Sequence, residues 1–302
     1  MACASAGASA LDPVSRAYDP ALGGLLSEAA TLDVSYDVRS RSVWMAYKAS
    51  APPHFSLTVL NDITLVRDRL IALFTAEPAA AEHVRYLVMA SHKPGVFNLG
   101  GDLLMFAKAV RETDRERLSF YAHRCVELVH GLATGFGLPI VTVAAVAGRA
   151  FGGGLEAALA EDFLIASPDA QLGVPEVAFN SFPGMGAVSM LSRRVGMAQA
   201  EQVISSGAIY SGQQMYDMGV VDVLSAGADL HAFALDWLAA GGEERFARRL
   251  ALARARRTQF PVELAELVRV TDLWVECCSG ASQNDVRHME RLASAQKRLI
   301  AF

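Results

Sequence analysis

Residues 139–162 read PIVTVAAVAGRAFGGGLEAALAED, and this stretch predicts a strand, a glycine-rich turn and a helix in immediate succession. The strand is expected over residues 139–147 and the helix over Leu155–Asp162. The first N–H groups of a helix lack hydrogen-bond partners and carry partial positive charge. Because Gly152–Gly154 have no side chains, a ligand can approach this backbone closely. The turn therefore offers main-chain N–H groups suited to stabilising a developing oxyanion.

Two glutamates are candidates for proton transfer. Glu156 is the only ionisable residue of residues 151–160, and burial there would raise its pKa toward neutral pH. Glu176 follows Pro175 on a loop, twenty residues further along the chain. A parallel sheet can bring both carboxyls to one edge, where they can divide the removal and the delivery of a proton. By contrast, Glu161 lies near the far end of the predicted helix and is expected to face solvent or an arginine.

A second glycine pair, Gly100-Gly101, repeats the arrangement of strand, turn and helix. It follows a strand expected over Tyr86–Ser91 and precedes a helix expected over Leu103–Arg111, which Asp102 can cap. Backbone donors that converge from two such turns can build an oxyanion hole. Taken singly, such a turn is more often a packing feature. Neither turn carries a phosphate-binding fingerprint or a G-x-S-x-G nucleophile elbow.

Composition and charge narrow the class of protein. The 302 residues are 52% hydrophobic and carry a formal net charge of −5, which is typical of a globular chain and disfavours nucleic acid as a partner. No apolar run approaches the ~18 residues of a membrane span, and the N-terminus lacks the features of a signal peptide. The four cysteines form no C-x-x-C pair and have no histidine at zinc-ligand spacing. A cytoplasmic, reduced and metal-free protein is expected.

Strands that alternate with helices predict an α/β fold with three parts. Residues 1–30 are rich in Ala, Ser and Gly and are expected to form a loose N-terminal tail, and residues 31–242 are expected to form the core. Beyond Gly241-Gly242 no further strand is expected. Residues 243–302 are predicted to be a helical domain with helices over Glu243–Arg257, Pro261–Cys278 and Asn284–Ile300.

Four motifs in this order resemble the enoyl-CoA hydratase/isomerase (crotonase) superfamily: FNLGGD at 97–102, AGRAFGGGLE at 147–156, LGVPE at 172–176 and FPGMG at 182–186. The resemblance covers residues 31–302 and implies a crotonase-type ββα spiral core with a C-terminal helical oligomerisation domain. It therefore implies a homotrimer or a hexamer. At matching positions it assigns catalysis to Glu156 and Glu176, the oxyanion hole to Gly101 and Gly153, and substrate binding to Gly100 and Gly152.

A narrower resemblance, to the diffusible-signal-factor (DSF) synthases, rests on NLGGD at 98–102, EAAL at 156–159, PEVAF at 175–179, TDLWV at 271–275 and MERL at 289–292. It implies dehydration of a 3-hydroxyacyl thioester on acyl carrier protein, followed by hydrolysis to a cis-2-unsaturated fatty acid used in quorum sensing. It places Met185 and Trp274 in the acyl pocket. It also implies a sensor kinase as a regulatory partner, and no cofactor beyond the carrier that bears the thioester.

Other interpretations stay open. The chain can instead be an ordinary enoyl-CoA hydratase or isomerase, or a non-catalytic binding protein of the same fold. Met185 and Trp274 can be core residues, and six arginines between Arg245 and Arg257 can form a solvated helix face rather than a docking site for carrier protein or CoA phosphates. Chain length, product geometry, the choice between acyl carrier protein and CoA, and the division of acid and base between the glutamates cannot be read from the residues.

Overall fold

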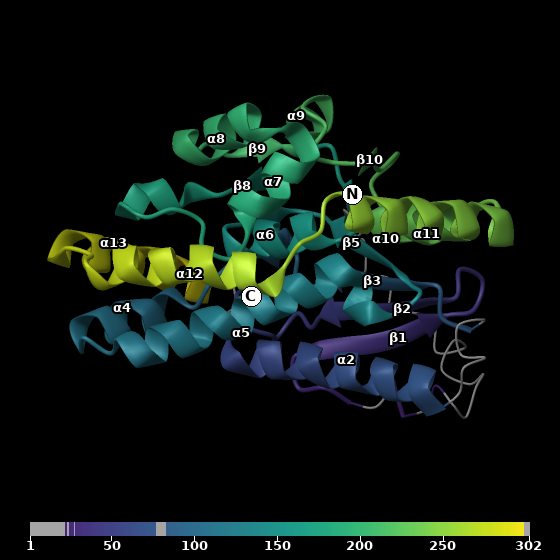
Figure 1. Cartoon of the computed structure of the whole chain (residues 1–302), viewed down its shortest axis with the longest axis horizontal. Coiled ribbons are helices and arrows are strands. Elements are labelled where there is room, and N and C mark those ends of the chain that lie inside the picture. The colour runs from purple at the N-terminus through teal and green to yellow at the C-terminus, as the bar shows by residue number, and fades with distance from the viewer. Residues whose placement is uncertain (1–21, 23, 27, 77–82, 299–302) are drawn as a thin grey trace, which may run out of the picture.

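The chain alternates between two sheets as it advances. The computed structural model describes residues 22, 24–26, 28–76 and 83–298 (Figure 1). A six-stranded sheet has the order β1-β2-β3-β5-β7-β10, and a four-stranded sheet has the order β4-β6-β8-β9. From β3 to β8, consecutive strands enter the two sheets in turn, and a helix follows each of the units β3-β4, β5-β6 and β7-β8. This is the predicted ββα repeat, and the α/β class with a C-terminal helical region is confirmed.

The strands have the following bounds. The large sheet contains β1 (Leu32–Asp37), β2 (Ser42–Tyr47), β3 (Tyr86–Ser91), β5 (Val141–Val146), β7 (Phe163–Ala166) and β10 (Val223–Leu224), with only β1 antiparallel to its neighbour. The small sheet contains β4 (Val96–Asn98), β6 (Arg149–Phe151), β8 (Gln171–Gly173) and β9 (Tyr210–Ser211), with β4, β6 and β8 mutually parallel.

The helices lie around and after these strands. They are α2 (Leu57–Ala76), α4 (Leu103–Arg111), α5 (Arg115–Thr134), α6 (Gly153–Ala160), α7 (Ala187–Val195), α8 (Met197–Ser206), α9 (Gly212–Asp217), α10 (Leu230–Ala239), α11 (Gly242–Gln259), α12 (Leu264–Ser279) and α13 (Gln283–Arg298). Two 3-10 helices, η2 (Gly135–Gly137) and η3 (Pro175–Phe179), complete the set described.

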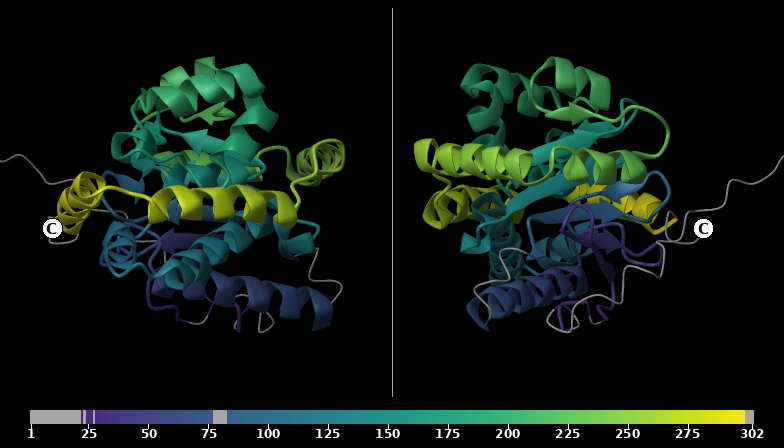
Figure 2. Two further views of the ribbon diagram at one scale, coloured as in Figure 1. Left: turned by 60° about the vertical axis from the view of Figure 1, so that its left-hand side comes forward. Right: turned by 90° about the vertical axis from the view of Figure 1, so that its right-hand side faces the viewer.

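Strand β5 explains why residues 139–147 are so apolar. Its alternate residues Val141, Val143 and Ala145 belong to a core cluster with α10 and α11, whereas Ala144 and Val146 pack into the main core with α5 and α6. Figure 2 shows α10 and α11 along one side of the large sheet. A strand enclosed between two helical layers needs apolar side chains on both faces, so β5 reads as a continuous run rather than an alternating one.

The small sheet positions the candidate site. Strands β4, β6 and β8 are neighbours, with Asn98 opposite Ala150 and Phe151 opposite Gly173. Because the three strands are parallel, the segments that follow them leave the sheet at the same edge. Gly100-Gly101 follows β4, Gly152-Gly153 follows β6, and Glu176 follows β8. The spiral thus gathers residues that are up to seventy-six positions apart in the sequence.

The C-terminal helices fold back over the core. Helix α12 packs along α5, and α13 packs along α4, the helix that follows Gly100-Gly101 (Figure 1). In the described part of residues 243–302 all regular structure is helical, as predicted. The role of this region in oligomerisation stays a prediction. Of the helices in the described ranges, none has the length and apolar character that crossing a bilayer requires.

Several expectations need adjustment. The core begins before residue 31, because Leu22, Leu25 and Ala29 are already buried in it; the rest of the predicted tail falls largely outside the described residues. Strands β4, β6, β9 and β10 and helices α9 and α10 were not predicted. The helix expected over Leu155–Asp162 runs over Gly153–Ala160, so the glycines form its first turn rather than preceding it.

Candidate active site

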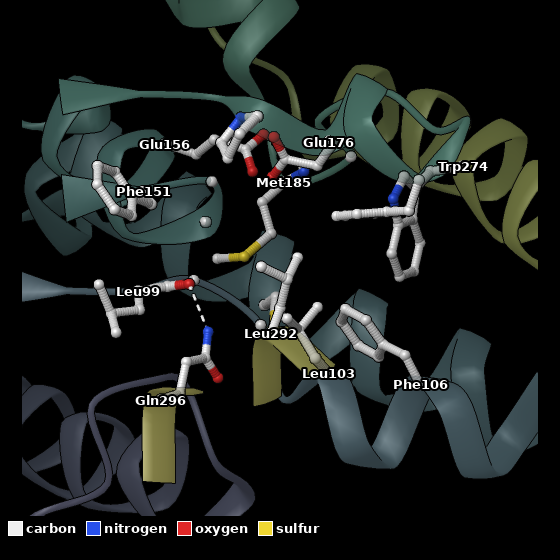
Figure 3. Close-up of a pocket in the computed structure, with 18 of the residues that line it drawn as sticks. Leu99, Leu103, Phe106, Phe151, Glu156, Glu176, Met185, Trp274, Leu292 and Gln296 are labelled. Carbon is white, nitrogen blue, oxygen red and sulfur yellow. Dashed lines mark hydrogen bonds between the residues drawn. The ribbon is translucent and has the colours of Figure 1, made fainter. Parts of the chain in front are cut away.

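A cavity of about 370 Å³ lies at the edge where β4, β6 and β8 end. All eight residues assigned to the site by resemblance line it: Gly100, Gly101, Gly152, Gly153, Glu156, Glu176, Met185 and Trp274. The carboxyl groups of Glu156 and Glu176 lie close together on one wall, and Trp274 and Phe106 lie together at one end (Figure 3). The roles of these residues remain proposals, but the structure brings them into a single chamber.

Glu156 is buried in the first turn of α6 and is held by main-chain donors. Its side chain is 2% exposed, and its Oε1 accepts hydrogen bonds from the N–H groups of Met185 (2.8 Å) and Ala187 (2.9 Å). Burial raises the pKa of this carboxyl to about 7, although the two N–H groups act in the opposite direction by favouring the charged form. Glu156 can therefore exchange a proton near neutral pH.

Glu176 lies on η3 directly after Pro175 and faces the same space. Burial raises the pKa of its carboxyl well above the ordinary value, and the charge of Glu156 raises it further. Among the described residues its Oε2 has no hydrogen-bond partner, while its Oε1 occupies the space that a side chain at position 152 would need. Two close carboxyls resist ionising together, so the pair titrates jointly and holds one proton over part of the pH range.

The two glycine turns touch each other. A side chain at Gly100, which has φ +91°, would lie 3.0 Å from the main-chain N of Gly153. Gly153 is the first residue of α6, so its N–H has no partner within the helix. Within the described ranges, neither the Gly101 nor the Gly153 N–H donates a hydrogen bond. Two main-chain donors without acceptors therefore border the cavity that contains the glutamates.

The end of the cavity away from Leu99 is apolar. The Trp274 ring packs on Gly184, where a side chain would overlap it, and meets the edge of Phe106 with ring centroids 5.0 Å apart. Met185 lies against Gly153. Met185 and Trp274 are therefore both core residues and cavity-lining residues, so the two interpretations of their sequence positions do not exclude each other.

Helix α13 closes part of the cavity with residues that sequence reasoning missed. Its Leu292, Ala295 and Gln296 line the chamber, and Gln296 Nε2 donates to the Leu99 carbonyl at 3.3 Å (Figure 3). The missed set also includes Leu103, Phe106, Tyr121, Cys125, Phe151 and Phe179. Helical spacing from Asp102 could have indicated Leu103 and Phe106 as an inward face of α4, but nothing in the sequence signalled the contribution of α13.

Two expectations about charged residues are corrected. Of the two surroundings expected for Glu161, solvent is wrong, because the residue is 2% exposed. An arginine is present: Arg194 donates to the main-chain carbonyl of Glu161 at 2.7 Å, and its charge acts to lower the pKa of the carboxyl. The arginines of α11 do not form one free face, because Arg249 packs over the Trp237 ring and Arg257 pairs with Asp162 at 2.5 Å. No residue of α11 lines the cavity. In the ranges described, no three His, Cys, Asp or Glu side chains lie close enough to hold a metal ion.

Comparison with known proteins identifies the family. The sequence profile described as Enoyl-CoA hydratase/isomerase matches residues 61–266. The mitochondrial methylglutaconyl-CoA hydratase of Rattus norvegicus is 28% identical over 224 residues, which are 72% of this chain and 65% of the relative. Enoyl-CoA isomerase/hydratase fer4 of Mycosarcoma maydis is 33% identical over 175 residues, 57% of this chain and 61% of the relative. The chain thus spans less than two thirds of the length of these curated relatives.

Solved structures share the fold at lower identity. An enoyl-CoA hydratase/isomerase from Xanthobacter autotrophicus Py2 superposes with a TM-score of 0.69 at 20% identity, covering 91% of this chain and 97% of that one. Human mitochondrial delta3-delta2-enoyl-CoA isomerase gives a TM-score of 0.67 at 19% identity, covering 89% and 98%. Together with the profile match over more than half of the sequence, these findings show that the chain belongs to the enoyl-CoA hydratase/isomerase family, the crotonase superfamily.

Proposed function

We propose that the protein is a hydratase-type lyase that interconverts a 2-enoyl thioester and a 3-hydroxyacyl thioester, with CoA as the carrier. The observation that carries the proposal is one cavity bordered by two buried carboxyls and two main-chain N–H groups without acceptors. Family membership supports the same reaction class. The proposal does not include the methylglutaconyl group named for one relative. That acyl group carries a second carboxylate, whereas the end of this cavity around Trp274 and Phe106 is apolar.

The chemistry follows from the groups present. In the dehydration direction, one carboxylate removes a proton from Cα of the thioester, and negative charge develops on the carbonyl oxygen. The Gly101 and Gly153 N–H groups would hold that oxygen. The other carboxyl gives its proton to the β-hydroxyl, the C–O bond breaks, and water leaves as the double bond forms. The pair starts with one proton and ends with one proton, which suits two carboxyls that titrate jointly.

A second candidate adds hydrolysis of the thioester, as in the DSF synthases. Its support is the apolar end of the cavity, where Met185 and Trp274 stand at the positions that the resemblance assigns to the acyl pocket. A carboxylate would activate a water molecule against the same polarised carbonyl carbon. The C–S bond would break, and the thiol of the carrier would leave with the free cis-2-unsaturated acid as the other product.

One assay separates these functions. Purified protein is supplied with matched 2-enoyl and 3-hydroxyacyl thioesters of CoA and of acyl carrier protein, while hydration and thiol release are measured together. Interconversion of the CoA thioesters without thiol release supports the hydratase. Thiol release with free acid, faster from acyl carrier protein, supports the synthase. Binding of both thioesters without turnover would reject both enzymes and leave a non-catalytic binding protein.

A further inference from the structure

The turn that carries Gly101 is fastened through a tyrosine hydroxyl rather than by a regular strand pair. Phe55 and Gly101 form an isolated parallel bridge, in which the Phe55 N–H donates to the Gly100 carbonyl at 2.8 Å. A regular bridge of this register would continue with the Asp102 N–H donating to the Phe55 carbonyl. Instead, Tyr121 lies between them: its hydroxyl accepts from the Asp102 N–H (3.1 Å) and donates to the Phe55 carbonyl.

The direction of these two hydrogen bonds is fixed by the chemistry of the hydroxyl. Tyr121 is buried on α5, and burial raises its pKa well above the ordinary value, so the group keeps its single proton. That proton goes to the Phe55 carbonyl, which can only accept, and a lone pair takes the Asp102 N–H, which can only donate. The hydroxyl therefore provides a hydrogen-bond partner to the buried Phe55 carbonyl and to the partly buried Asp102 N–H.

These hydrogen bonds determine the direction in which the Gly101 N–H points. In a planar trans peptide the C=O and N–H groups point in opposite directions, so the bond from Phe55 to the Gly100 carbonyl directs the Gly101 N–H away from Phe55. Asn98 Oδ1 accepts from the Gly100 N–H at 2.8 Å and steadies the preceding peptide unit. Tyr121 holds the following unit. The peptide units on both sides of Gly101 are therefore held, the preceding one by Phe55 and the following one by Tyr121, so both backbone torsions of Gly101 are constrained.

We propose that Tyr121 is a positioning residue that sets the direction of the Gly101 N–H toward the thioester oxygen, with Asn98 as its support on the other side of the turn. This inference rests on the proposed function. Tyr121 itself would not exchange a proton with the substrate. It acts by holding the donor still before charge develops, and a donor that needs no reorganisation stabilises an oxyanion most effectively.

The test compares Tyr121→Phe with Tyr36→Phe as the matched control. Both tyrosines are buried and donate to a main-chain carbonyl, Tyr36 to His83 at 2.6 Å, but Tyr36 lies on β1 and does not line the cavity. The readouts are kcat and KM for an enoyl-CoA substrate, and the red shift of bound dimethylaminocinnamoyl-CoA, whose absorption reports polarisation of its carbonyl. Tyr121→Phe is expected to lower kcat ~10–100-fold, change KM less than about threefold, and reduce the red shift.

The control should lose comparable stability yet keep kcat and the red shift. Asn98→Ala is a second variant, which removes the hydrogen bond to the Gly100 N–H on the other side of the turn. It should also lower kcat and the red shift, and it replaces Tyr121→Phe in the test if that variant does not fold. Unchanged kcat and red shift in the folded variants would overturn the role of Tyr121. A wild-type protein that binds the chromophore without any red shift and turns over no thioester would instead reject the proposed function, and this inference with it.

Discussion

The two ends of helix α6 carry glutamates that are alike in burial and different in surroundings. Glu156 and Glu161 lie five residues apart, and each is 2% exposed. Burial raises the pKa of both carboxyls. Glu156 accepts two main-chain hydrogen bonds and shares a cavity with Glu176. Glu161 has no hydrogen bond to either carboxyl oxygen within the described residues.

The C-terminal end of α6 is organised around an arginine instead. Arg194 donates to the carbonyls of Leu159 (3.2 Å) and Glu161 (2.7 Å) and pairs with Asp222 at 2.8 Å. Helix C-termini leave carbonyls without partners and carry partial negative charge, so a cation there is stabilising. A buried carboxyl with a raised pKa is therefore insufficient evidence for a catalytic site. Glu161 also borders a cavity, of about 300 Å³, together with Asp162, whose charge raises the pKa of Glu161 further. The N-terminal end differs because Glu156 accepts main-chain hydrogen bonds and shares its cavity with two glycine N–H groups that have no acceptor among the described residues.

The largest effect on turnover is expected from the glutamates of the cavity. Glu156→Gln or Glu176→Gln removes a group that carries the transferred proton, while the side chain keeps its shape. Each is expected to lower kcat by roughly 10²–10⁴-fold, about 3–5 kcal/mol of transition-state stabilisation. Steady-state kinetics with the enoyl-CoA substrate measure this, and circular dichroism checks that the fold is retained.

The matched control is Glu161→Gln, which makes the same chemical change five residues further along the same helix. It is expected to keep kcat within about twofold, because Glu161 does not line the cavity that contains Glu156 and Glu176. A comparable loss of kcat in Glu161→Gln would mean that a buried negative charge anywhere on α6 matters, and the distinction between the two ends would be lost.

The sequence was enough to predict the glycine turns and both glutamates of the site, but not the strands and helices that form the walls of its cavity. The glycine turns and both glutamates could be recognised because each occupies a short segment with distinctive residue types after a strand. Strands β4 and β6 were missed because each has only three residues, too few to produce a periodic pattern. These two strands are nevertheless what brings Gly100 beside Gly153 and places Gly101 and Gly153 on the same cavity.

The wall formed by α13 could not be predicted for a different reason. Leu292 and Gln296 read as ordinary positions of an amphipathic helix, and their approach to Leu99 depends on how α13 packs along α4. The expected exposure of Glu161 to solvent is wrong for a separate reason. A charged residue at a helix end is usually exposed. Here strand β7 begins two residues later, with Phe163 paired to Val143 in the large sheet, so Glu161 is buried where the helix meets the sheet.

An intermediate effect is expected from Gly152→Ala at the N-terminal end of α6. Gly152 has φ +50° and ψ −127°, which disfavours a side chain, and a Cβ there would overlap Glu176 Oε1. The substitution should displace the Glu176 carboxyl and lower kcat about 10–100-fold. Gly227→Ala is the control, since Gly227 has φ +95° but no described atom lies within 4 Å of the position that its Cβ would take. Equal kcat losses in both would show that backbone strain, and not displacement of Glu176, is responsible.

The smallest effect on turnover, and a distinct effect on stability, is expected from pH. A carboxyl whose pKa is raised by folding keeps its proton longer in the folded state, so stability is greatest below the unfolded value of about 4.5 and falls as pH rises toward the folded value. For Glu156 this window ends at about pH 7. For Glu161 stability falls in the same direction, because burial raises the pKa of its carboxyl well above the ordinary value. Urea unfolding of wild type, Glu156→Gln and Glu161→Gln between pH 4 and about pH 8 measures how the free energy of unfolding changes with pH.

Both Glu156→Gln and Glu161→Gln should make the free energy of unfolding less dependent on pH, because glutamine does not titrate. Only Glu161→Gln should do so while turnover is retained, since its carboxyl lies outside the cavity. A Glu161→Gln protein whose stability fell with pH as steeply as wild type would mean that Glu161 ionises as easily when folded as when unfolded. In that case the attraction between Arg194 and the carboxylate would offset the effect of burial completely, and both ends of α6 would contain a satisfied glutamate.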